Sequence, residues 1–171
     1  MKILVLDGNE LHRQAAVAQF SKHELTVVGS YIEAETVLKK GQFDVFLTDL
    51  FLPAPAKTTN PESSKLIGAQ MPIGTIIALL ATRQPEMRYV GILTAPYHHT
   101  DHPASACIDP FNTVPIRVGV CKMLMANCGT FSCCFDKSNL NQPLTNCPIG
   151  VNSVCSKNWK AFLEYVIRRG E

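Results

Sequence analysis

Two aspartates follow short apolar runs in the first third of the chain. Asp7 follows the run 2–6, and Asp49 follows the run 43–48. If the two runs are neighbouring parallel strands, both carboxylates lie at the carboxyl edge of the sheet, where open α/β sheets bind their ligands. Carboxylates that lie close together repel each other, so they share a proton or bind a cation. Such an oxygen-rich pocket suits a hard divalent ion such as Mg²⁺.

Three histidines and an aspartate form a second candidate site soon after the fourth apolar run. They are His98, His99, Asp101 and His102, and a helical conformation would place His98 and His102 on one face. Imidazole and carboxylate groups are suitable ligands for Zn²⁺ and other transition metals. Alternatively, Thr100 or Asp101 caps a short helix, and the histidines bond only to backbone or solvent.

The seven cysteines all lie in the second half of the chain, and five of them form a third candidate group. Cys128, Cys133, Cys134 and Cys147 form the pattern C-x4-CC-x12-C, and Cys155 follows. The pattern lacks the C-x2-C knuckles of structural zinc sites, but the thiolates could still converge on Zn²⁺. An odd count without an export signal favours free thiols or a metal site over a disulfide framework. Disulfides formed after purification and buried free cysteines remain open alternatives.

The first half of the chain alternates between strand and helix patterns, which would position these residues. Four short runs, apolar on both faces, predict strands that are covered on both sides. They are residues 2–6, 25–29, 43–48 and 88–94. Helical patterns separate them, so the sequence predicts an α/β fold with a doubly wound, parallel, five-stranded sheet of order 2-1-3-4-5.

Capping residues mark the ends of the predicted helices. The expected signals are Asn9 for the first helix, Ser30, Glu33 and a C′ Gly41 for the second, Pro72 and Pro85 for the third, and Ser156 for the last. The last helix carries an apolar stripe at helical spacing, formed by Trp159, Phe162, Leu163, Val166 and Ile167.

Length and composition favour a single globular domain over residues 1–171. Two stretches exceed a minimal α/β sheet and predict insertions. Residues 54–71 form a loop rich in Pro, Ser, Thr and Asn, and residues 112–155 form a β-hairpin followed by a Cys-rich loop before the last helix.

Four segments resemble the receiver domain of response regulators, in order and roughly in spacing. They are KILVLDGNE, FDVFLTDLFLP, VGILTA and CIDPF. The resemblance implies a flavodoxin-like fold. It also implies that Asp49 stands at the phosphate-accepting position, that Thr94 stands at the switch hydroxyl, and that Asp7 belongs to an acidic pair that holds Mg²⁺.

Two positions depart from the family's pattern. Gly8 stands where the family has its second acid, and Asp109 stands where the family has a lysine that offsets charge on the phosphoryl group. An aspartate there makes phosphorylation electrostatically less favourable. We therefore expect a degenerate receiver, or pseudo-receiver, that is not a conventional phosphoacceptor. Asp7, Asp49 and Asp109 could instead form a cation site.

The expected function is a regulatory or protein-interaction module in signalling, rather than an enzyme. No output domain follows the last helix, so the signal would leave through a surface that binds another protein, a homodimer being one such arrangement. The alternative is a metal-binding enzyme, such as a Zn²⁺ or Mg²⁺ hydrolase, that uses His98, His99 and His102 with Asp7 and Asp49.

The charge pattern argues against nucleic-acid and membrane partners. The formal net charge is +2, and no run of Lys and Arg is longer than two residues, so there is no basic surface for nucleic acid. No segment reaches the roughly 18 uninterrupted apolar residues of a membrane helix. The apolar start is interrupted at Asp7, too early for a secretory signal. We expect a cytoplasmic protein.

Overall fold

The fold is built on a six-stranded sheet, in the order β2-β1-β3-β6-β8-β7. The computed structural model describes residues 1–56, 64–94, 115–127, 131–144 and 153–170. The strands of this sheet are β1 (Lys2–Leu6), β2 (Glu24–Val28), β3 (Val45–Thr48), β6 (Tyr89–Thr94), β7 (Ile116–Val118) and β8 (Cys121–Asn127). All neighbouring strands pair in parallel except β7, which is antiparallel to β8 at one edge.

The predicted α/β architecture with a largely parallel sheet is confirmed, but the five-stranded order is not matched, since the sheet has six strands. The difference arises at the hairpin expected in the insertion 112–155. β7 and β8 form that hairpin, and β8 pairs in parallel with β6 and so belongs to the main sheet. Buried residues on β8 (Cys121, Met123, Leu124 and Ala126) explain why it lies inside the sheet.

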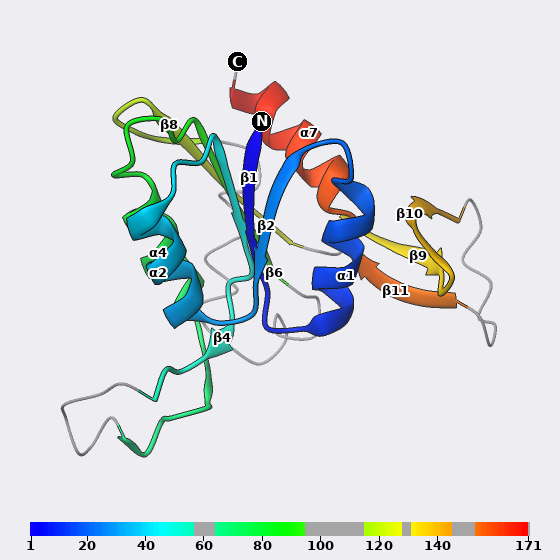
Figure 1. Ribbon diagram of the computed structural model, residues 1–171, viewed down its shortest axis with the longest axis horizontal. Coiled ribbons are helices and arrows are strands. Elements are labelled where there is room, and N and C mark those ends of the chain that lie inside the picture. Colours follow the sequence, from blue (N-terminus) through cyan, green and yellow to red (C-terminus); the bar gives the residue numbers. More distant parts are fainter. Residues whose placement is uncertain (57–63, 95–114, 128–130, 145–152, 171) are drawn as a thin grey trace.

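Helices cover both faces of the sheet (Figure 1). Helices α1 (Glu10–Gln19) and α7 (Trp159–Gly170) pack on one face, while α2 (Tyr31–Lys40) and α4 (Gly74–Ala81) pack on the other. Alternate residues of β1 enter the two cores: Ile3 and Val5 face α1 and α7, and Leu4 and Leu6 face α2 and α4. A strand that is buried on both sides must be apolar throughout, as β1 is.

The predicted N-caps of the first two helices are confirmed. Asn9 accepts a hydrogen bond from the Leu11 amide, and Ser30 and Glu33 form both bonds of a capping box. The predicted C′ position of Gly41 is wrong. Gly41 is the C-cap of α2, and its φ of −111° is an extended conformation rather than a left-handed one.

The predicted starts of the other two helices are also wrong. Pro72 lies ahead of α4, which begins at Gly74, although the helix does end before Pro85. Ser156 is not the cap of α7, because it is a buried residue of strand β11 (Ser153–Lys157). The side chain of Asn158 accepts a hydrogen bond from the Ala161 amide at 3.0 Å and caps the helix instead.

Two smaller sheets occupy the stretches that were predicted as insertions. β4 (Leu52–Pro53) and β5 (Gln70–Met71) pair across the base of the loop 54–71. β9 (Ser132–Asp136), β10 (Asn139–Pro143) and β11 form an antiparallel sheet of order β10-β9-β11 beside α1 (Figure 1). Part of the expected Cys-rich loop is therefore regular structure. Strand β11 leads almost directly into α7, so this small sheet positions residues next to the carboxyl edge of the main sheet.

Candidate functional site

The carboxyl edge of the main sheet carries Asp7 and Asp49 on adjacent strands. The register of β1 and β3 pairs Leu6 with Thr48, and each aspartate is the next residue of its chain segment. Asp7 is fully buried and Asp49 is 6% exposed. The backbone amide of Asp49 donates to the Leu6 carbonyl at 2.9 Å, which continues the pairing of the strands to this point.

A buried lysine lies between the two aspartates. Nζ of Lys157 is 2.7 Å from Oδ2 of Asp7 and 3.1 Å from Oδ1 of Asp49. The side chain of Lys157 has no exposed surface, since it extends inward from the end of β11. A charge without water is stable only when it is paired and hydrogen-bonded, and these two carboxylates supply the partners.

Backbone groups fix both carboxylates. Oδ1 of Asp7 accepts from the Asn9 amide at 2.8 Å, and Oδ1 of Asp49 accepts from the Leu50 amide at 2.8 Å. Arg13 donates to the backbone carbonyls of Asp7 and Gly8 at 2.9 and 3.0 Å. The turn after β1 is therefore held in place from the first helix, and Asp7 has little freedom to move away from Lys157.

Burial dominates the electrostatics of Asp49. It raises the pKa of the Asp49 carboxyl above its ordinary value, Lys157 lowers that pKa, and the charge of Asp7 raises it again. Among the described residues, two carboxylates and one ammonium group meet at this point. Burial therefore favours the protonated, neutral form of Asp49 beside the pair of Lys157 and Asp7.

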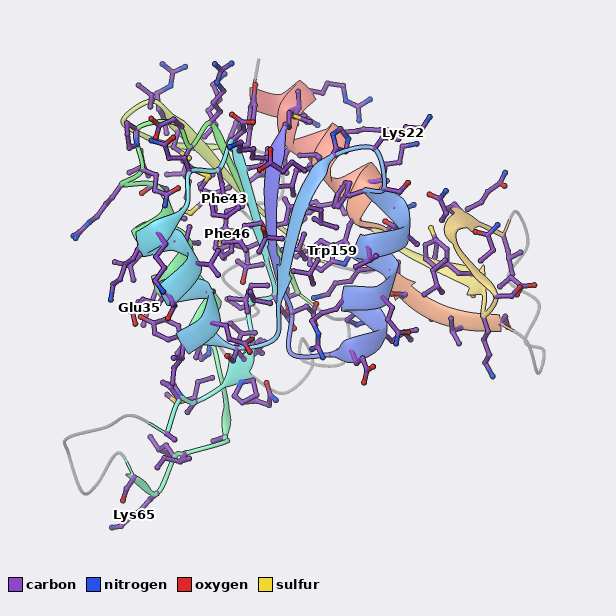
Figure 2. The ribbon with its side chains drawn as sticks, in the orientation of Figure 1. Lys22, Glu35, Phe43, Phe46, Lys65 and Trp159 are labelled. Carbon is purple, nitrogen blue, oxygen red and sulfur yellow. The ribbon has the colours of Figure 1, made fainter. Side chains whose placement is uncertain are left out.

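Trp159 and His12 form a wall next to the lysine. Nζ of Lys157 lies 5.0 Å from the centroid of the Trp159 ring, whose Nε1 donates to the His12 carbonyl at 2.9 Å. Figure 2 shows Trp159 on the side of the sheet that carries α1. Nδ1 of His12 is 3.1 Å from Oγ of Ser156. Burial, the largest cause, lowers the pKa of His12 to about 4; Asp7 raises this pKa and Lys157 lowers it.

Thr94, at the switch position implied by the receiver resemblance, ends β6 at the same edge. Its side chain is fully buried, and its hydroxyl has no hydrogen-bond partner among the described residues. A buried hydroxyl without a partner is costly, so Thr94 is an available donor at this edge of the sheet.

Several predicted ligands lie outside the described residues: Asp109, His98, His99, Asp101, His102, Cys128 and Cys147. The proposed histidine and three-carboxylate metal sites therefore stay predictions. Within the described ranges, no group of three or more His, Cys, Asp or Glu side chains is arranged to hold a metal ion.

The cysteines of the small sheet are close together. Cys134 is disulfide-bonded, whereas Cys133 and Cys155 are thiols. The register of β9 and β11 places Cys155 opposite Cys134, and their sulfur atoms are 3.2 Å apart. A Zn²⁺ site that includes Cys134 would require its disulfide to be reduced first, because only a thiolate binds the metal.

Lys157 belongs to this candidate site, and the sequence did not predict it. It precedes Asn158 and Trp159, not the Pro-Phe pair that follows the family's lysine. Its position in the sequence could have indicated it. Lys157 is the one charged residue in the segment Ser153–Lys157, which lies immediately before an amphipathic helix. A cation at such a junction is a candidate partner for acids at the ends of other strands.

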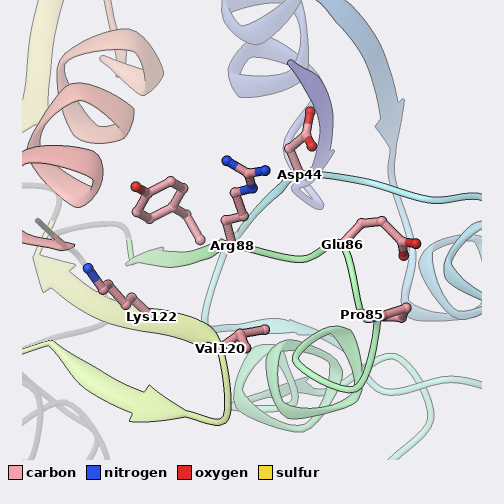
Figure 3. A pocket seen from close by; sticks show the side chains of 7 residues that line it. Asp44, Pro85, Glu86, Arg88, Val120 and Lys122 are labelled. Carbon is pink, nitrogen blue, oxygen red and sulfur yellow. The ribbon is translucent and has the colours of Figure 1, made fainter.

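A hollow of about 510 Å³ lies at the opposite, amino-terminal edge of the strands (Figure 3). Its charged lining residues are Asp44, Glu86, Arg88 and Lys122. Two cations and two carboxylates give it no net charge that would select an ion. We therefore place the candidate site at the carboxyl edge.

None of the helices in the described ranges has the length and apolar character needed to cross a membrane. Comparison of the chain with models of protein families, with curated proteins and with solved structures finds no match.

Proposed function

We propose that this protein is a receiver-like regulatory or protein-interaction module whose phosphoacceptor position is held by an internal lysine. The observation that carries the proposal is the contact of one buried ammonium group, that of Lys157, with both Asp7 and Asp49. Asp49 is then not a conventional phosphoacceptor.

Three features support a receiver-like arrangement. The strands β2-β1-β3-β6-β8 follow the order expected of a flavodoxin-like sheet, with β7 as an additional edge strand. Asp7, Asp49 and Thr94 all lie at the carboxyl edge of this sheet. Lys157 brings an ammonium group to Asp49, which is the charge-offsetting role that the family assigns to its lysine.

Two features oppose conventional phosphorylation. Mg²⁺ in the family is held by an acidic pair, and Gly8 supplies no second carboxylate. In addition, Lys157 already occupies the position between Asp7 and Asp49 that a cation would take. Breaking a buried pair of this kind costs about 3–5 kcal/mol, so a divalent ion competes at a large disadvantage.

The site is connected to surface elements that a partner could bind. Lys157 is the last residue of β11, and α7 begins two residues later. A movement of β11 or of the start of α7 would therefore displace the ammonium group. A protein partner that binds these elements would respond to the state of the buried site.

The test restores the missing metal ligand and removes the internal cation. Wild-type protein and the double variant Gly8→Asp, Lys157→Met are incubated with acetyl phosphate and Mg²⁺, and covalent phosphate is measured by mass spectrometry. Among the described residues, a Cβ at Gly8 meets only Pro53 Cδ at 3.4 Å, an ordinary contact, so their packing accepts a side chain here. We expect no phosphate on the wild type and Mg²⁺-dependent phosphate on the double variant.

A matched triple variant that adds Asp49→Asn should lose the phosphate again. Circular dichroism in the same buffer establishes that each variant is folded. Phosphate on the wild type would show a conventional receiver. A folded double variant that binds Mg²⁺ but takes up no phosphate would contradict the receiver-like assignment.

A further inference from the structure

We infer that Lys157 and Asp49 are the reactants of a spontaneous intramolecular amide bond, a covalent cross-link between the last strand and β3. The inference goes beyond the proposed function, because it depends only on the contacts around Lys157 and not on the receiver resemblance. It assigns a modification site whose two reacting groups both belong to this chain.

The geometry is that of an amine held next to a carboxylic acid. Nζ of Lys157 is 3.1 Å from Oδ1 of Asp49, and the atom that it would attack is the carboxyl carbon to which this oxygen is bonded. Well-oriented reacting groups held next to each other in one molecule reach effective concentrations of about 10⁵ M or more. Such concentrations favour amide formation between groups that would not condense in dilute solution.

The protonation states also suit the reaction. Burial raises the pKa of Asp49, which favours the neutral acid form that an amine can attack. Lys157 must lose a proton to become a nucleophile, and Oδ2 of Asp7, 2.7 Å from Nζ, is placed to accept it. The structure therefore provides a nucleophile, an electrophile and a general base within one buried group.

The condensation of Lys157 with Asp49 needs no reactant from outside the protein. Lys157 transfers one proton to Asp7, and the neutral amine forms a C–N bond to the carboxyl carbon of Asp49. The Leu50 amide, 2.8 Å from Oδ1, stabilises the negative charge that develops on this oxygen. Asp7 then relays a proton from the attacking nitrogen to the departing hydroxyl group. The C–O bond breaks, one water leaves, and the original ammonium proton stays on Asp7.

The surroundings protect the product from hydrolysis. Asp7 and Lys157 are fully buried, and the indole ring of Trp159 covers the ammonium group at 5.0 Å. Burial of the amine and of Asp7 keeps the local concentration of water low, which slows hydrolysis of the amide in the folded protein. The amide also removes the cost of keeping a charged pair away from water, so folding favours the cross-linked product.

The test is the intact mass of the reduced wild-type chain. We expect a mass lower than that of the sequence by one water. Trypsin should fail to cleave after Lys157, and peptide 41–57 should be recovered joined to peptide 138–160. Unfolding the purified chain should not reverse the change. A reduced wild-type chain with the full sequence mass overturns the inference.

Succinimide formation at an aspartate also removes a water, and Asp7-Gly8 is a favourable sequence for it because glycine hinders the reaction least. Hydroxylamine opens a succinimide but leaves a side-chain amide intact. A mass loss that hydroxylamine abolishes, without the joined peptides, would contradict the cross-link.

Variants separate the reacting groups from their neighbours. Lys157→Met and Asp49→Ala should each show the full mass, while Lys160→Arg, a change at an exposed lysine on the following helix, should still lose one water. Asp7→Ala should slow the reaction several-fold in refolded protein, followed by mass over time. Loss of water in Lys157→Met would overturn the assignment of the nucleophile.

Discussion

Nζ of Lys157 lies 2.7 Å from Oδ2 of Asp7, although 150 residues separate the two in the chain. This contact joins the end of the first strand to the end of the last one. It is reinforced by Trp159, whose Nε1 donates to the His12 carbonyl, and by Gln19, whose side chain bonds to the Lys157 carbonyl and the Lys160 amide. Helix α1 is therefore fixed to β11 and α7 by polar contacts as well as by the apolar core.

Replacement of Lys157 should destabilise the protein strongly. Lys157→Met conserves the volume of the side chain but leaves Asp7 and Asp49 facing each other without a cation. Relative to wild-type chain in which the amide has not formed, we expect the free energy of unfolding near neutral pH to fall by about 3–5 kcal/mol, because uncompensated buried charge is costly. Urea denaturation measures this directly.

The same variant should respond to acid and to Mg²⁺. A carboxyl whose pKa is raised in the folded state favours folding at low pH and loses this contribution as the pH rises through the folded-state pKa. Lys157→Met should therefore become more stable as the pH falls from about 7 to about 5, and Mg²⁺ should stabilise it by binding the free carboxylates. Lys160→Arg is the control and should show neither effect. A variant as stable as the wild type would contradict the role of Lys157.

The first strands of the main sheet could be predicted because a strand that is buried on both faces must consist of apolar residues. Residues 3–6 are apolar throughout, and the structure places alternate residues of β1 in the two cores. β8 also has an apolar sequence. Because β7 and β8 are antiparallel neighbours, their sequence predicted a hairpin outside the main sheet. Which strand a hairpin joins depends on distant residues, here those of β6.

The site could be predicted only in part. Asp7 and Asp49 follow recognisable strands, so their proximity follows from strand order. Lys157 lies on β11, and the position of β11 depends on its pairing with β9. The sequence of β11 has no clear strand pattern of its own. Ser156 was a reasonable helix cap from local sequence, but its contact with His12 holds it in the strand. Tertiary contacts override local preference at both residues.

The half-buried His12 should make the protein sensitive to mild acid. Burial lowers the pKa of His12 from 6.5 to about 4, so the folded state opposes protonation that the unfolded chain accepts. This contribution to stability is present above pH 6.5 and is lost as the pH falls toward 4. The difference between the two pKa values corresponds to at most about 3.4 kcal/mol.

His12→Gln should remove this pH dependence, since glutamine does not titrate and can still bond to Ser156. The urea midpoint of His12→Gln should differ less between about pH 7 and about pH 5 than the midpoint of the wild type does. The matched control, His23→Gln at an exposed histidine, should retain the wild-type loss of stability. Equal pH dependence in His12→Gln and the wild type would contradict the buried neutral imidazole.

The two most accessible thiols of the small sheet should react differently from Cys121. Cys155 is exposed and Cys133 is half-buried, while burial raises the pKa of Cys121 to about 11. Near pH 8, about one Cys121 thiol in a thousand is ionised, so alkylation of this residue should require unfolding. Iodoacetamide labelling followed by peptide mass analysis should detect Cys155 first. Labelling of Cys121 at the same rate in folded protein would show that β8 opens readily.

Close packing behind Asp49 should make Gly74 irreplaceable. A Cβ at Gly74 would lie 2.0 Å from the carbonyl oxygen of Asp49 and 2.8 Å from Cα of Leu50. The start of α4 and the segment after β3 would have to separate, which also breaks the bond from the Gly74 amide to the Leu50 carbonyl. We expect Gly74→Ala to lower the free energy of unfolding by about 1–3 kcal/mol or more, as overpacked substitutions do.

Gly8→Ala is the control at the same edge of the sheet. Among the described residues its Cβ meets only Pro53, at 3.4 Å, so it should change the free energy of unfolding by less than about 0.5 kcal/mol. Equal urea midpoints for the two variants would contradict close packing of α4 against the backbone of Asp49. The contacts with Lys157 and Leu50 would then have to hold the carboxylate in place.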